Sequence, residues 1–374
     1  MRVALIHDWL NGMRGGEKVL EVFCELYPLA DVYTLFYEPQ KVSPLIRSMR
    51  IHEHPLAKRL AVTRRHYRYL LPFMPRMIES FKIKNYDLVI STSHCVAKGI
   101  VAQPPETPHI CYCFTPMRYI WDKYDDYFGN KWKLSSWMMP MFRKGLQEWD
   151  VETAVRVGHF VTTSNYVRDR IREHYLREAL VVPAPVDCDR FADTERLPED
   201  FFLIVSALEP YKRIDVAIDA FRELRWPLKI AGTGSQMRRL KRRAPRNVEF
   251  LGWVSDEELA SLYSRARAVV FPADEDFGIV PLEAAASGCP VIAYRHGGAL
   301  ETVIEGKTGI FFDEQTPAAL IEAVRDFAEE KFDNEELRAH ARLYDRPVFK
   351  QRVGDLIRDV ARLPNPAAPE PPAE

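Results

Sequence analysis

The sequence lacks a long apolar run, a cluster of cysteines and any large excess of charge. No segment approaches the roughly 18 consecutive apolar residues that a membrane span requires. The N-terminal stretch Met1–His7 is too short in apolar residues for a signal peptide. The formal net charge is −1, which argues against a general electrostatic nucleic-acid binder. We therefore expect a soluble or peripheral protein with no nucleic-acid partner.

The six cysteines are scattered and form no CxxC pair with a second cluster, which argues against a zinc site. Cys111 and Cys113 are two residues apart in an apolar run, a spacing that places both thiols on one face of a buried strand. We expect reduced cysteines in the core of a cytoplasmic protein. No metal motif such as DxD with clustered histidines stands out, so the sequence predicts no metal and no resident cofactor.

The length of 374 residues favours two domains, because single cores rarely grow beyond about 250–300 residues. Short apolar runs alternate with helical patterns, which predicts an α/β fold with two doubly wound parallel sheets. Pro183 and Pro185 make a stiff connector between the halves. We expect domains over 1–183 and 184–345, a helix over 346–362 that returns to the N-terminal domain, and a disordered Pro/Ala/Glu-rich tail over 363–374.

The apolar runs and helical periodicities place most elements. The predicted strands are Val3–His7, Leu88–Ser91, Ile110–Phe114, His159–Thr163, Phe202–Ser206, Leu228–Ala231, Val248–Leu251, Ala268–Phe271, Val291–Ala293 and Gly309–Phe312. The predicted helices are Glu17–Leu26, Ile214–Arg222, Ser235–Arg243, Asp256–Ser264, Leu282–Ala286 and Pro317–Ala328. Asn11–Gly16 is predicted to be a glycine-rich turn.

The most specific segment is ADEDFGIVPLEA, residues 273–284. Glu275 lies in the loop after a predicted strand, and Glu283 lies one turn into the following helix. Between them the chain enters a helix N-terminus, where free N–H groups favour an anion. A diphosphate could bind the amides around Gly278–Val280, with the two carboxylates holding sugar and ribose hydroxyls. A simple helix cap is the alternative.

Three further segments carry weaker signals. Lys212 and Arg213 precede a helix and could neutralise a leaving diphosphate, although surface pairs of this kind are common. Gly232 and Gly234 lack the third glycine and the acidic residue of a dinucleotide site, and indicate a tight strand–helix turn. Gly297-Gly298 is either a simple turn or a donor of amides to a sugar.

The segment Arg47–Lys84 is strongly basic and has aromatic and aliphatic residues interleaved. This pattern is typical of a helix that binds an anionic membrane surface. A solvated helical face over the core is an equally good interpretation. An RNA-binding patch is less favoured, because no RNA-binding motif accompanies it.

The run from Asn247 to Phe312 resembles the donor domain of the family 4 retaining glycosyltransferases, which have the GT-B fold of two Rossmann-like domains facing across a cleft. HDWLNGMRGGEKVLE, STSHCVAKG, TPMRYIWD and PYKRID resemble segments of the bacterial mannosyltransferases that build O-antigen and exopolysaccharide. The resemblance covers the chain to about Arg362. It implies transfer of a hexose, mannose from GDP-mannose being favoured, to a glycan acceptor. The basic segment Arg47–Lys84 suggests that this acceptor is lipid-linked rather than a free oligosaccharide, which would place the protein at the cytoplasmic face of the membrane.

The resemblance also implies roles for single residues. Glu275 and Glu283 match the Glu-x7-Glu motif that contacts the transferred sugar and the ribose. Lys212 matches the diphosphate-binding lysine, with Arg213 beside it. Phe277, Gly278, Ile279 and Val280 match the segment whose backbone caps the diphosphate in the family. Gly15 and Gly16 match the glycine-rich loop that faces the phosphates.

Two positions depart from the family pattern. Ala207 stands where relatives often have an arginine, and Phe114 stands where many have a histidine that touches the donor sugar. His7, His94 and Arg118 are candidate contacts to a sugar or acceptor, and a structural histidine is an equal alternative for the first two. The departures keep open a catalytically silent scaffold that binds nucleotide sugar. A nucleotide-sugar epimerase remains a second alternative, and a nicotinamide-dependent oxidoreductase a much weaker third.

Overall fold

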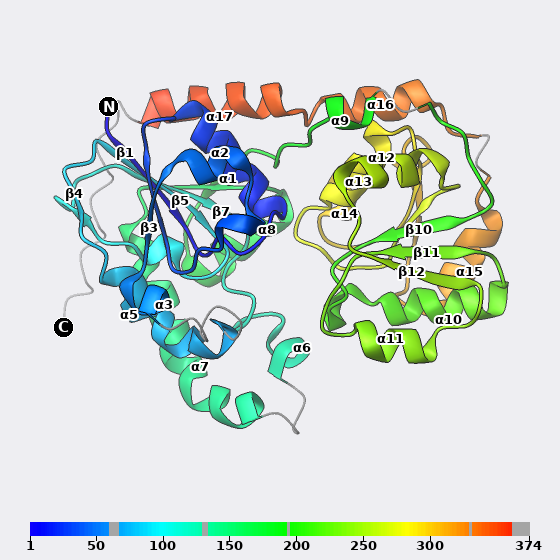
Figure 1. Cartoon of the computed structure of the whole chain (residues 1–374), viewed down its shortest axis with the longest axis horizontal. Helices are drawn as coiled ribbons and strands as arrows, with labels where there is room; N and C mark the ends of the chain where they lie inside the picture. Colours follow the sequence, from blue (N-terminus) through cyan, green and yellow to red (C-terminus); the bar gives the residue numbers. More distant parts are fainter. Residues whose placement is uncertain (60–66, 129–133, 193–194, 329–330, 361–374) are drawn as a thin grey trace. The chain divides into compact units, whose positions relative to one another are not determined.

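The computed structural model describes residues 1–59, 67–128, 134–192, 195–328 and 331–360. The chain divides into two compact units. Unit 1 contains Met1–Pro183 and the residues from Phe349 onward, and unit 2 contains Ala184–Val348. Each unit has its own parallel sheet and its own core (Figure 1). The predicted disordered tail lies outside the described residues.

The sheet of unit 1 has the strand order β3-β2-β1-β5-β7-β8-β9, and all neighbouring strands are parallel. The strand order reverses between β1 and β5, so the loops that follow these two strands lie at the switch point of the sheet. The strands are β1 Val3–His7, β2 Asp31–Thr34, β3 Arg50–Glu53, β5 Leu88–Ser93, β7 His109–Cys113, β8 His159–Thr162 and β9 Ala179–Val181. A separate pair joins β4 Ile83–Lys84 and β6 Ala102–Gln103.

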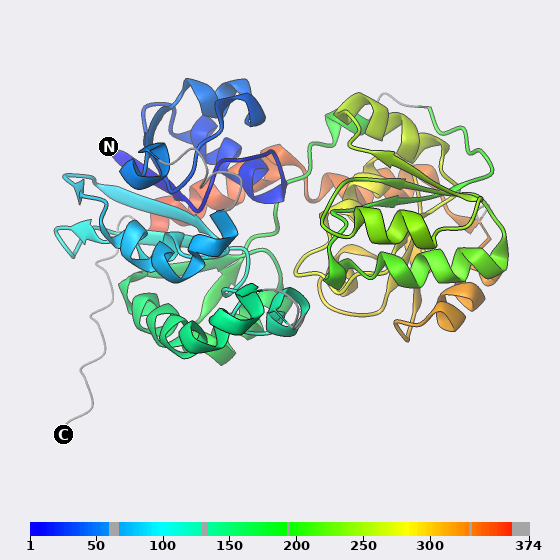
Figure 2. The ribbon, with the colours of Figure 1, turned by 60° about the horizontal axis from the view of Figure 1, so that its bottom comes forward.

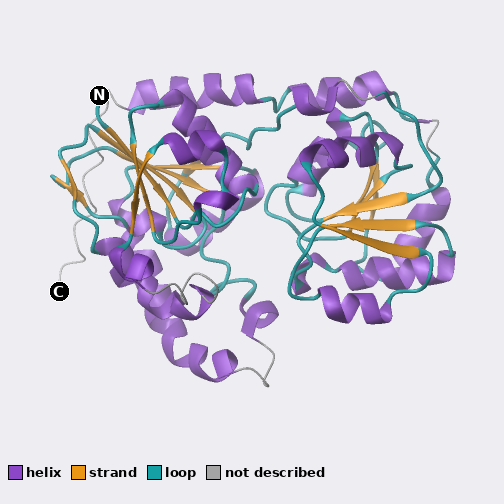
Figure 3. Ribbon diagram, in the orientation of Figure 1, coloured by secondary structure: helices purple, strands orange, loops and turns teal. Residues whose placement is uncertain are grey.

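Helices cover both faces of this sheet (Figure 2 and Figure 3). They are α1 Gly15–Leu26, α2 Pro44–Ser48, α3 Pro55–Arg59, α5 Met74–Glu79, α6 Tyr124–Phe128, α7 Leu134–Glu152 and α8 Asn165–Tyr175, with 3-10 turns at Pro39–Lys41, Tyr67–Phe73, Ala97–Gly99 and Thr153–Arg156. Helix α17, Arg346–Val360, belongs to unit 1 from Phe349 onward. The Phe349 ring packs 6.2 Å from Phe23 and 5.7 Å from Tyr112 between centroids, which fixes this helix to unit 1.

The sheet of unit 2 has the strand order β12-β11-β10-β13-β14-β15 and is also wholly parallel. Its strands are β10 Phe202–Val205, β11 Leu228–Ala231, β12 Val248–Gly252, β13 Val269–Phe271, β14 Val291–Tyr294 and β15 Gly309–Phe312. The switch point lies between β10 and β13. Ligands of doubly wound sheets bind beyond the carboxyl ends of the strands at such a point.

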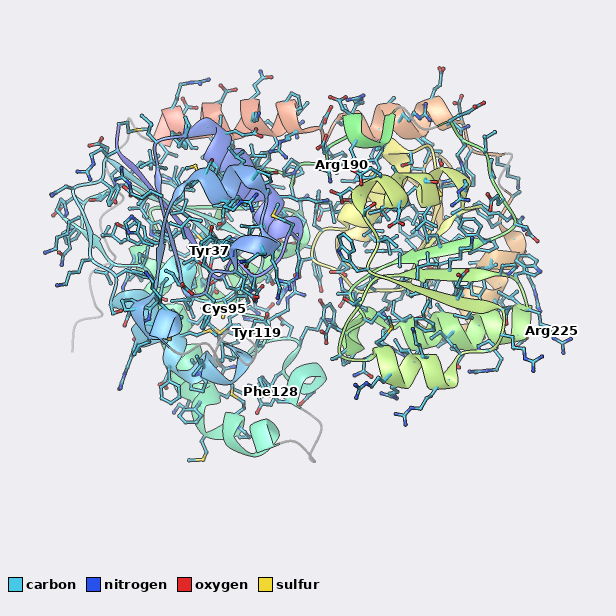
Figure 4. All side chains as sticks on the ribbon, viewed as in Figure 1. Tyr37, Cys95, Tyr119, Phe128, Arg190 and Arg225 are labelled. Atoms are coloured by element: carbon cyan, nitrogen blue, oxygen red, sulfur yellow. The ribbon has the colours of Figure 1, made fainter. Side chains whose placement is uncertain are left out.

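The helices of unit 2 are α9 Asp189–Ala192, α10 Ile214–Leu224, α11 Met237–Arg243, α12 Asp256–Arg265, α13 Ile279–Ala286, α14 Ala299–Thr302, α15 Pro317–Asp326 and α16 Asn334–Arg342, with a 3-10 turn at Pro210–Lys212. Helix α10 ends at Leu224, and its C-cap Arg225 has a left-handed backbone (φ 61°) and projects outward (Figure 4). The two ends of unit 2 meet where the Val186 N–H donates to the Tyr344 carbonyl at 2.9 Å.

All ten predicted strands are present, with ends shifted by at most two residues. The prediction missed β2 and β3, which are short and contain polar residues, and β9, which is apolar but only three residues long. The predicted end of the glycine-rich turn was wrong, because Gly15 and Gly16 already belong to the first turn of α1. Helix α13 begins earlier than predicted, since Pro281 in its first turn removes no intrahelical hydrogen bond.

The basic segment Arg47–Lys84 is not one helix in its described part but a series of short helices, turns and strands. Its residues Leu71, Met74 and Met77 are buried in the core of unit 1, whereas Arg76 and Lys82 are exposed. Phe73 is an exception, with an exposed ring. Among the described residues the segment is therefore not a single membrane-lying helix, and its exposed cations lie over the core of unit 1. No helix within those residues is long and apolar enough to span a bilayer.

Candidate functional site

The switch point of unit 2 brings together a lysine and a glutamate from two loops. Lys212 ends the 3-10 turn that follows β10, and Glu275 lies in the loop that follows β13. Nζ of Lys212 forms an ion pair with Oε1 of Glu275, and the two side chains are only 15% and 14% exposed. The ammonium group also lies 5.0 Å from the centre of the Tyr211 ring. The two residues predicted to be catalytic are therefore in direct contact.

Helix α13 begins beside this pair with a left-handed glycine. Gly278 is its N-cap, at φ 92°, and a Cβ there would lie 2.7 Å from Oγ1 of Thr302. Ile279 and Val280 follow and are half-buried. The N–H groups of a first helical turn have no intrahelical acceptor, so this turn is suited to an anion. Phe277 contributes only backbone here, because its ring is buried and packs against Tyr344.

The glycine pair Gly297-Gly298 supports the loop that carries Glu275. The Gly298 N–H donates to the Glu275 carbonyl at 2.7 Å. A Cβ on Gly298 would lie 2.3 Å from Cα of Phe277, and one on Gly297 would lie 2.4 Å from the Glu275 carbonyl oxygen. The pair therefore permits two loops to approach closely, so it acts as a packing turn within the site.

The GTGS turn supports the other loop of the site in a similar way. A Cβ on Gly232 would lie 1.9 Å from the Ser206 carbonyl oxygen, and one on Gly234 would lie 2.5 Å from that of Leu208. The Leu208 N–H donates to the Thr233 carbonyl at 2.9 Å. The tight turn predicted from the sequence is confirmed, and it packs directly against the segment leading to Lys212.

Glu283 has a partner that the sequence did not reveal. The hydroxyl of Tyr263, on α12, donates to Oε2 of Glu283 at 3.1 Å, and the glutamate is 5% exposed. Burial, followed by the neighbouring Glu283 carboxylate, raises the pKa of Tyr263 well above its usual value, so the phenol stays protonated and donates. Tyr263 therefore orients the second glutamate. Its only sequence signal was an apolar position on an amphipathic helix.

Arg213 is also in the loop after β10, but its guanidinium group is engaged elsewhere. Nη1 donates to Oε1 of Gln315 at 2.9 Å, and Nε lies 3.4 Å from the Asp215 carboxylate. Gln315 in turn donates to the Pro272 carbonyl at 2.8 Å. Arg213 thus links the loops after β10, β13 and β15. Ala207 is exposed in the first of these loops.

The remaining predicted residues lie at the switch point of unit 1. His7 ends β1 and is fully buried, with Nδ1 2.7 Å from Oγ1 of Thr92. Asp8 accepts the backbone N–H groups of residues 94–97 at 2.7–3.0 Å, and its carboxylate lies 3.1 Å from Nδ1 of His94. Cys95, labelled in Figure 4, belongs to this turn. Asp8 therefore fixes the loop after β5.

Gly16, Phe114 and Arg118 complete the predicted set in unit 1. A Cβ on Gly16 would lie 3.4 Å from Cε2 of Phe114 and 3.6 Å from Cε1 of His7, whereas nothing lies within 4 Å of one on Gly15. Phe114 and Arg118 follow β7 and are half-buried. The structure thus gathers the predicted residues into two groups, one at each switch point.

The cysteines lie in the cores of the two units. All six are buried and none forms a disulfide, and Cys111 and Cys113 pack in one apolar cluster, as predicted. Among the described residues, no three or more His, Cys, Asp or Glu side chains are grouped so that they could hold a metal ion.

Two family descriptions match adjoining parts of the chain. Residues 29–190 match Glycosyltransferase Family 4, and residues 187–344 match Glycosyl transferases group 1. The chain is 34% identical over 220 residues to a GDP-mannose-dependent alpha-(1-6)-phosphatidylinositol monomannoside mannosyltransferase of Mycolicibacterium smegmatis, covering 50% of this chain and 56% of that protein. It is 33% identical over 150 residues to O-antigen chain mannosyltransferase C of Escherichia coli, covering 38% and 39%.

These alignments span about half or less of the length of the curated relatives. Similarity over the whole chain comes from solved structures. Anabaena Alr3699/HepE, solved in complex with UDP, aligns over 96% of this chain and 100% of its own, with a TM-score of 0.69 and 16% identity. At 16% sequence identity this similarity shows the fold alone, and it agrees with the two doubly wound units of this chain.

Proposed function

Because the chain belongs to the family 4, group 1 glycosyltransferases of the GT-B fold, we propose that it is a retaining glycosyltransferase that moves a hexose from a nucleotide diphosphate sugar to a glycan acceptor. The two family matches adjoin and together run from residue 29 to residue 344. The site at the switch point of unit 2 is where a doubly wound sheet binds such a donor.

The observation that carries this proposal is the contact between Lys212 and Glu275 beside the first turn of α13. A diphosphate needs cations and N–H donors, and a sugar needs hydrogen-bond acceptors. The loops that follow β10 and β13, together with the first turn of α13, offer both the donors and the acceptors. Glu283, oriented by Tyr263, supplies a second carboxylate for the ribose.

In the proposed reaction the negative charge that develops on the departing nucleoside diphosphate is stabilised by Lys212 and by the amides of α13. The Glu275 carboxylate binds the transferred sugar and holds its anomeric carbon toward the acceptor. Departure leaves an oxocarbenium-like sugar, and the acceptor hydroxyl attacks from the same face. No covalent sugar–enzyme bond is assigned to a residue of this chain.

GDP-mannose is the donor we propose, since the relatives with assigned substrates include two mannosyltransferases, one of them named for GDP-mannose. A thermal-shift screen against GDP-, UDP-, ADP- and dTDP-sugars tests this choice. A ligand that binds only the folded protein raises the melting temperature by mass action. A rise in melting temperature with GDP-mannose alone supports the proposal. A larger rise with a UDP- or ADP-sugar would identify that sugar as the donor instead. No shift with any of the four removes the proposed function.

A lipid-linked acceptor at an anionic membrane surface is the second part of the proposal. It rests on the exposed cations Arg47, Lys58, Arg76, Lys82 and Lys84, together with the exposed ring of Phe73. Flotation with liposomes of neutral or of anionic lipids provides the test. We expect binding to anionic liposomes that weakens with salt. Equal flotation with both lipid types would remove the membrane part and leave the transferase proposal intact.

A further inference from the structure

The segment 224–248 of unit 2 contains eight basic residues and no acidic residue. The chain as a whole has a formal net charge of −1, so the overall balance conceals this local excess. Six of the eight cations are exposed and lie in helix α11 or shortly after it, and we call them the α11 surface: Arg238, Arg239, Lys241, Arg242, Arg243 and Arg246. Unit 2 therefore presents a dense positive charge along one helix.

Helix α11 points these side chains away from the core. It lies beside α10 on one face of the sheet (Figure 1), and Leu240 is buried in the core of unit 2. Successive residues of a helix are about 100° apart, so the positions two residues before and after Leu240 lie on the opposite side of α11. These positions are Arg238 and Arg242, and both are exposed. Their charges therefore face solvent.

Carboxylates neutralise little of this charge. Asp219 of α10 accepts from Nε of Arg243 at 3.0 Å, and it also pairs with Arg222. Within the described ranges of the chain, the other five cations of the α11 surface form no ion pair: Arg238, Arg239, Lys241, Arg242 and Arg246. Nζ of Lys241, for example, lies 5.8 Å from the centre of the Phe250 ring, which carries no charge. Five positive charges therefore remain uncompensated.

This arrangement costs helix α11 stability. Arg238 and Arg242 are one turn apart, as are Arg239 and Arg243, and like charges at this spacing repel each other. Arg238 and Arg239 also lie in the first turn, beside the positive end of the helix dipole. A polyanion bound to the α11 surface would relieve both kinds of repulsion. The charge pattern of α11 thus suits a helix that binds an array of negative charges.

The composition of the segment favours anionic lipid over nucleic acid as the source of these charges. Single-stranded nucleic acid is bound largely through bases that stack on aromatic side chains. The one aromatic residue of the segment 224–248 is Trp226, which is half-buried and stacks on Phe202 at 5.8 Å between centroids. An anionic lipid surface requires only clustered cations, and four to eight Lys and Arg residues on a helix are typical of such binding.

We propose that the α11 surface binds anionic lipid headgroups, so that unit 2 has a membrane contact of its own. The inference goes beyond the proposed function, because it uses neither the donor site nor the cations of the Arg47–Lys84 segment. The contact is electrostatic, since Leu240 is buried and Met237 is half-buried, so that neither is free to enter the lipid. Binding therefore weakens as the salt concentration rises.

The test is flotation of the full chain with vesicles of phosphatidylcholine alone or of equimolar phosphatidylcholine and phosphatidylglycerol. We expect the partition constant for the mixed vesicles to fall about 30-fold in Arg238→Gln/Arg242→Gln, since each cation near an anionic surface contributes about fivefold. The matched control is Lys307→Gln/Arg325→Gln, which makes the same change in net charge at two exposed cations of unit 2 that are paired with carboxylates. Its partition constant should stay within about twofold of the wild-type value.

The Arg47–Lys84 segment is the competing origin of lipid binding. Arg76→Gln/Lys82→Gln removes two exposed cations of that segment, and the α11 pair is changed both in the wild type and in this background. A further fall on changing Arg238 and Arg242 in either background supports the inference. An unchanged partition constant in both backgrounds overturns it and assigns lipid binding to unit 1. Partition that does not respond to salt also overturns it.

Two measurements exclude a folding defect and a nucleic-acid ligand. Arg238→Gln/Arg242→Gln should melt no lower than the wild type, because it relieves like-charge repulsion, and Lys241→Gln/Arg246→Gln repeats the test at other members of the α11 surface. Tighter binding of labelled single-stranded RNA or duplex DNA than of the mixed vesicles, at equal phosphate concentration, would assign the surface to nucleic acid. The rise in melting temperature with a nucleotide sugar should be the same in all these variants, so lipid binding and donor binding are decided separately.

Discussion

Nζ of Lys212 is paired with the carboxylate of Glu275 across the switch point of unit 2. The loops that carry them follow β10 and β13, which are hydrogen-bonded neighbours in the sheet although they are far apart in the chain. Each side chain fixes the position of the other. A donor that enters the site therefore meets a cation and a carboxylate that are already oriented, and little reorganisation is needed when charge develops.

Loss of either member of this pair should slow transfer strongly. We expect Lys212→Met and Glu275→Gln each to reduce kcat by about 100-fold, because each removes a group that stabilises the transition state. The matched control is the exposed pair of Lys307 and Glu336, 2.9 Å apart in the same unit. Lys307→Met should keep kcat within about twofold, since exposed ion pairs contribute little. Steady-state kinetics measure kcat in each variant. A kcat near the wild-type value in Lys212→Met would contradict the role of Lys212 in stabilising the transition state.

Gly278→Ala should impair the turn that opens α13. The change forces a left-handed backbone on alanine, at about 1–2 kcal/mol, and also brings Cβ to 2.7 Å from Oγ1 of Thr302. Gly306 has a similar positive φ of 75°, but nothing lies within 4 Å of its Cβ position. Gly306→Ala should therefore lower stability alone, whereas Gly278→Ala should also weaken donor binding. Calorimetric titration with GDP-mannose distinguishes the two, and equal affinities would show that the turn does not bind the donor.

Tyr263→Phe should act through Glu283. Without the phenol hydroxyl, the buried Oε2 loses the hydrogen bond from Tyr263, and the carboxylate is less well held for the ribose. We expect the KM for the donor to rise about fivefold with little change in kcat, as for loss of a ground-state hydrogen bond. Tyr112→Phe is the control, since its buried hydroxyl donates to the Val182 carbonyl at 2.7 Å in unit 1. A donor KM that rises equally in both variants would mean that stability alone is affected.

Breaking the buried pair of Lys98 and Asp150 should strongly destabilise unit 1. Lys98 is 1% exposed, and its Nζ lies 3.0 Å from Oδ1 of Asp150, whose Oδ2 accepts from Trp121 and Tyr175 at 2.8 Å. Lys98→Met leaves a buried carboxylate without its cation and should cost about 3–5 kcal/mol in the free energy of unfolding.

Urea denaturation measures this cost. The control is Lys144→Met, which removes one side of an exposed pair with Glu148 on α7. This variant should change the free energy of unfolding by no more than about 0.5 kcal/mol. A cost for Lys98→Met as small as that of the control would contradict the expectation that the buried Asp150 carboxylate needs this cation.

Transfer should not require a divalent cation. Lys212 and the amides of α13 are proposed to neutralise the diphosphate, so we expect the initial rate in excess EDTA to stay within about twofold of the rate with Mg²⁺. The assay includes a matched sample dialysed free of metal. A rate that collapses in EDTA and recovers with Mg²⁺ would assign part of the charge neutralisation to a metal ion.

The sequence alone determined the order of elements and most of their positions. Strands such as Leu228–Ala231 and Gly309–Phe312 were predicted with their exact bounds, because buried parallel strands are continuous apolar runs between turn residues. The Glu-x7-Glu spacing and the lysine after β10 were also readable, since each is a local pattern. The sequence missed β2 and β3, whose places in the sheet come from the pairing of β2 with β1 and of β3 with β2 rather than from their own composition.

Only the tertiary structure decided which side chains meet. The pairing of Lys212 with Glu275, the hydroxyl of Tyr263 on Glu283 and the hydrogen bond of His7 to Thr92 all join residues from different elements. Such contacts depend on strand order and on the packing of helices against the sheet, which periodicity does not encode. Nε2 of His7, which is buried and has no hydrogen-bond partner within the described ranges, is a further case, because a missing contact is visible only in the folded structure.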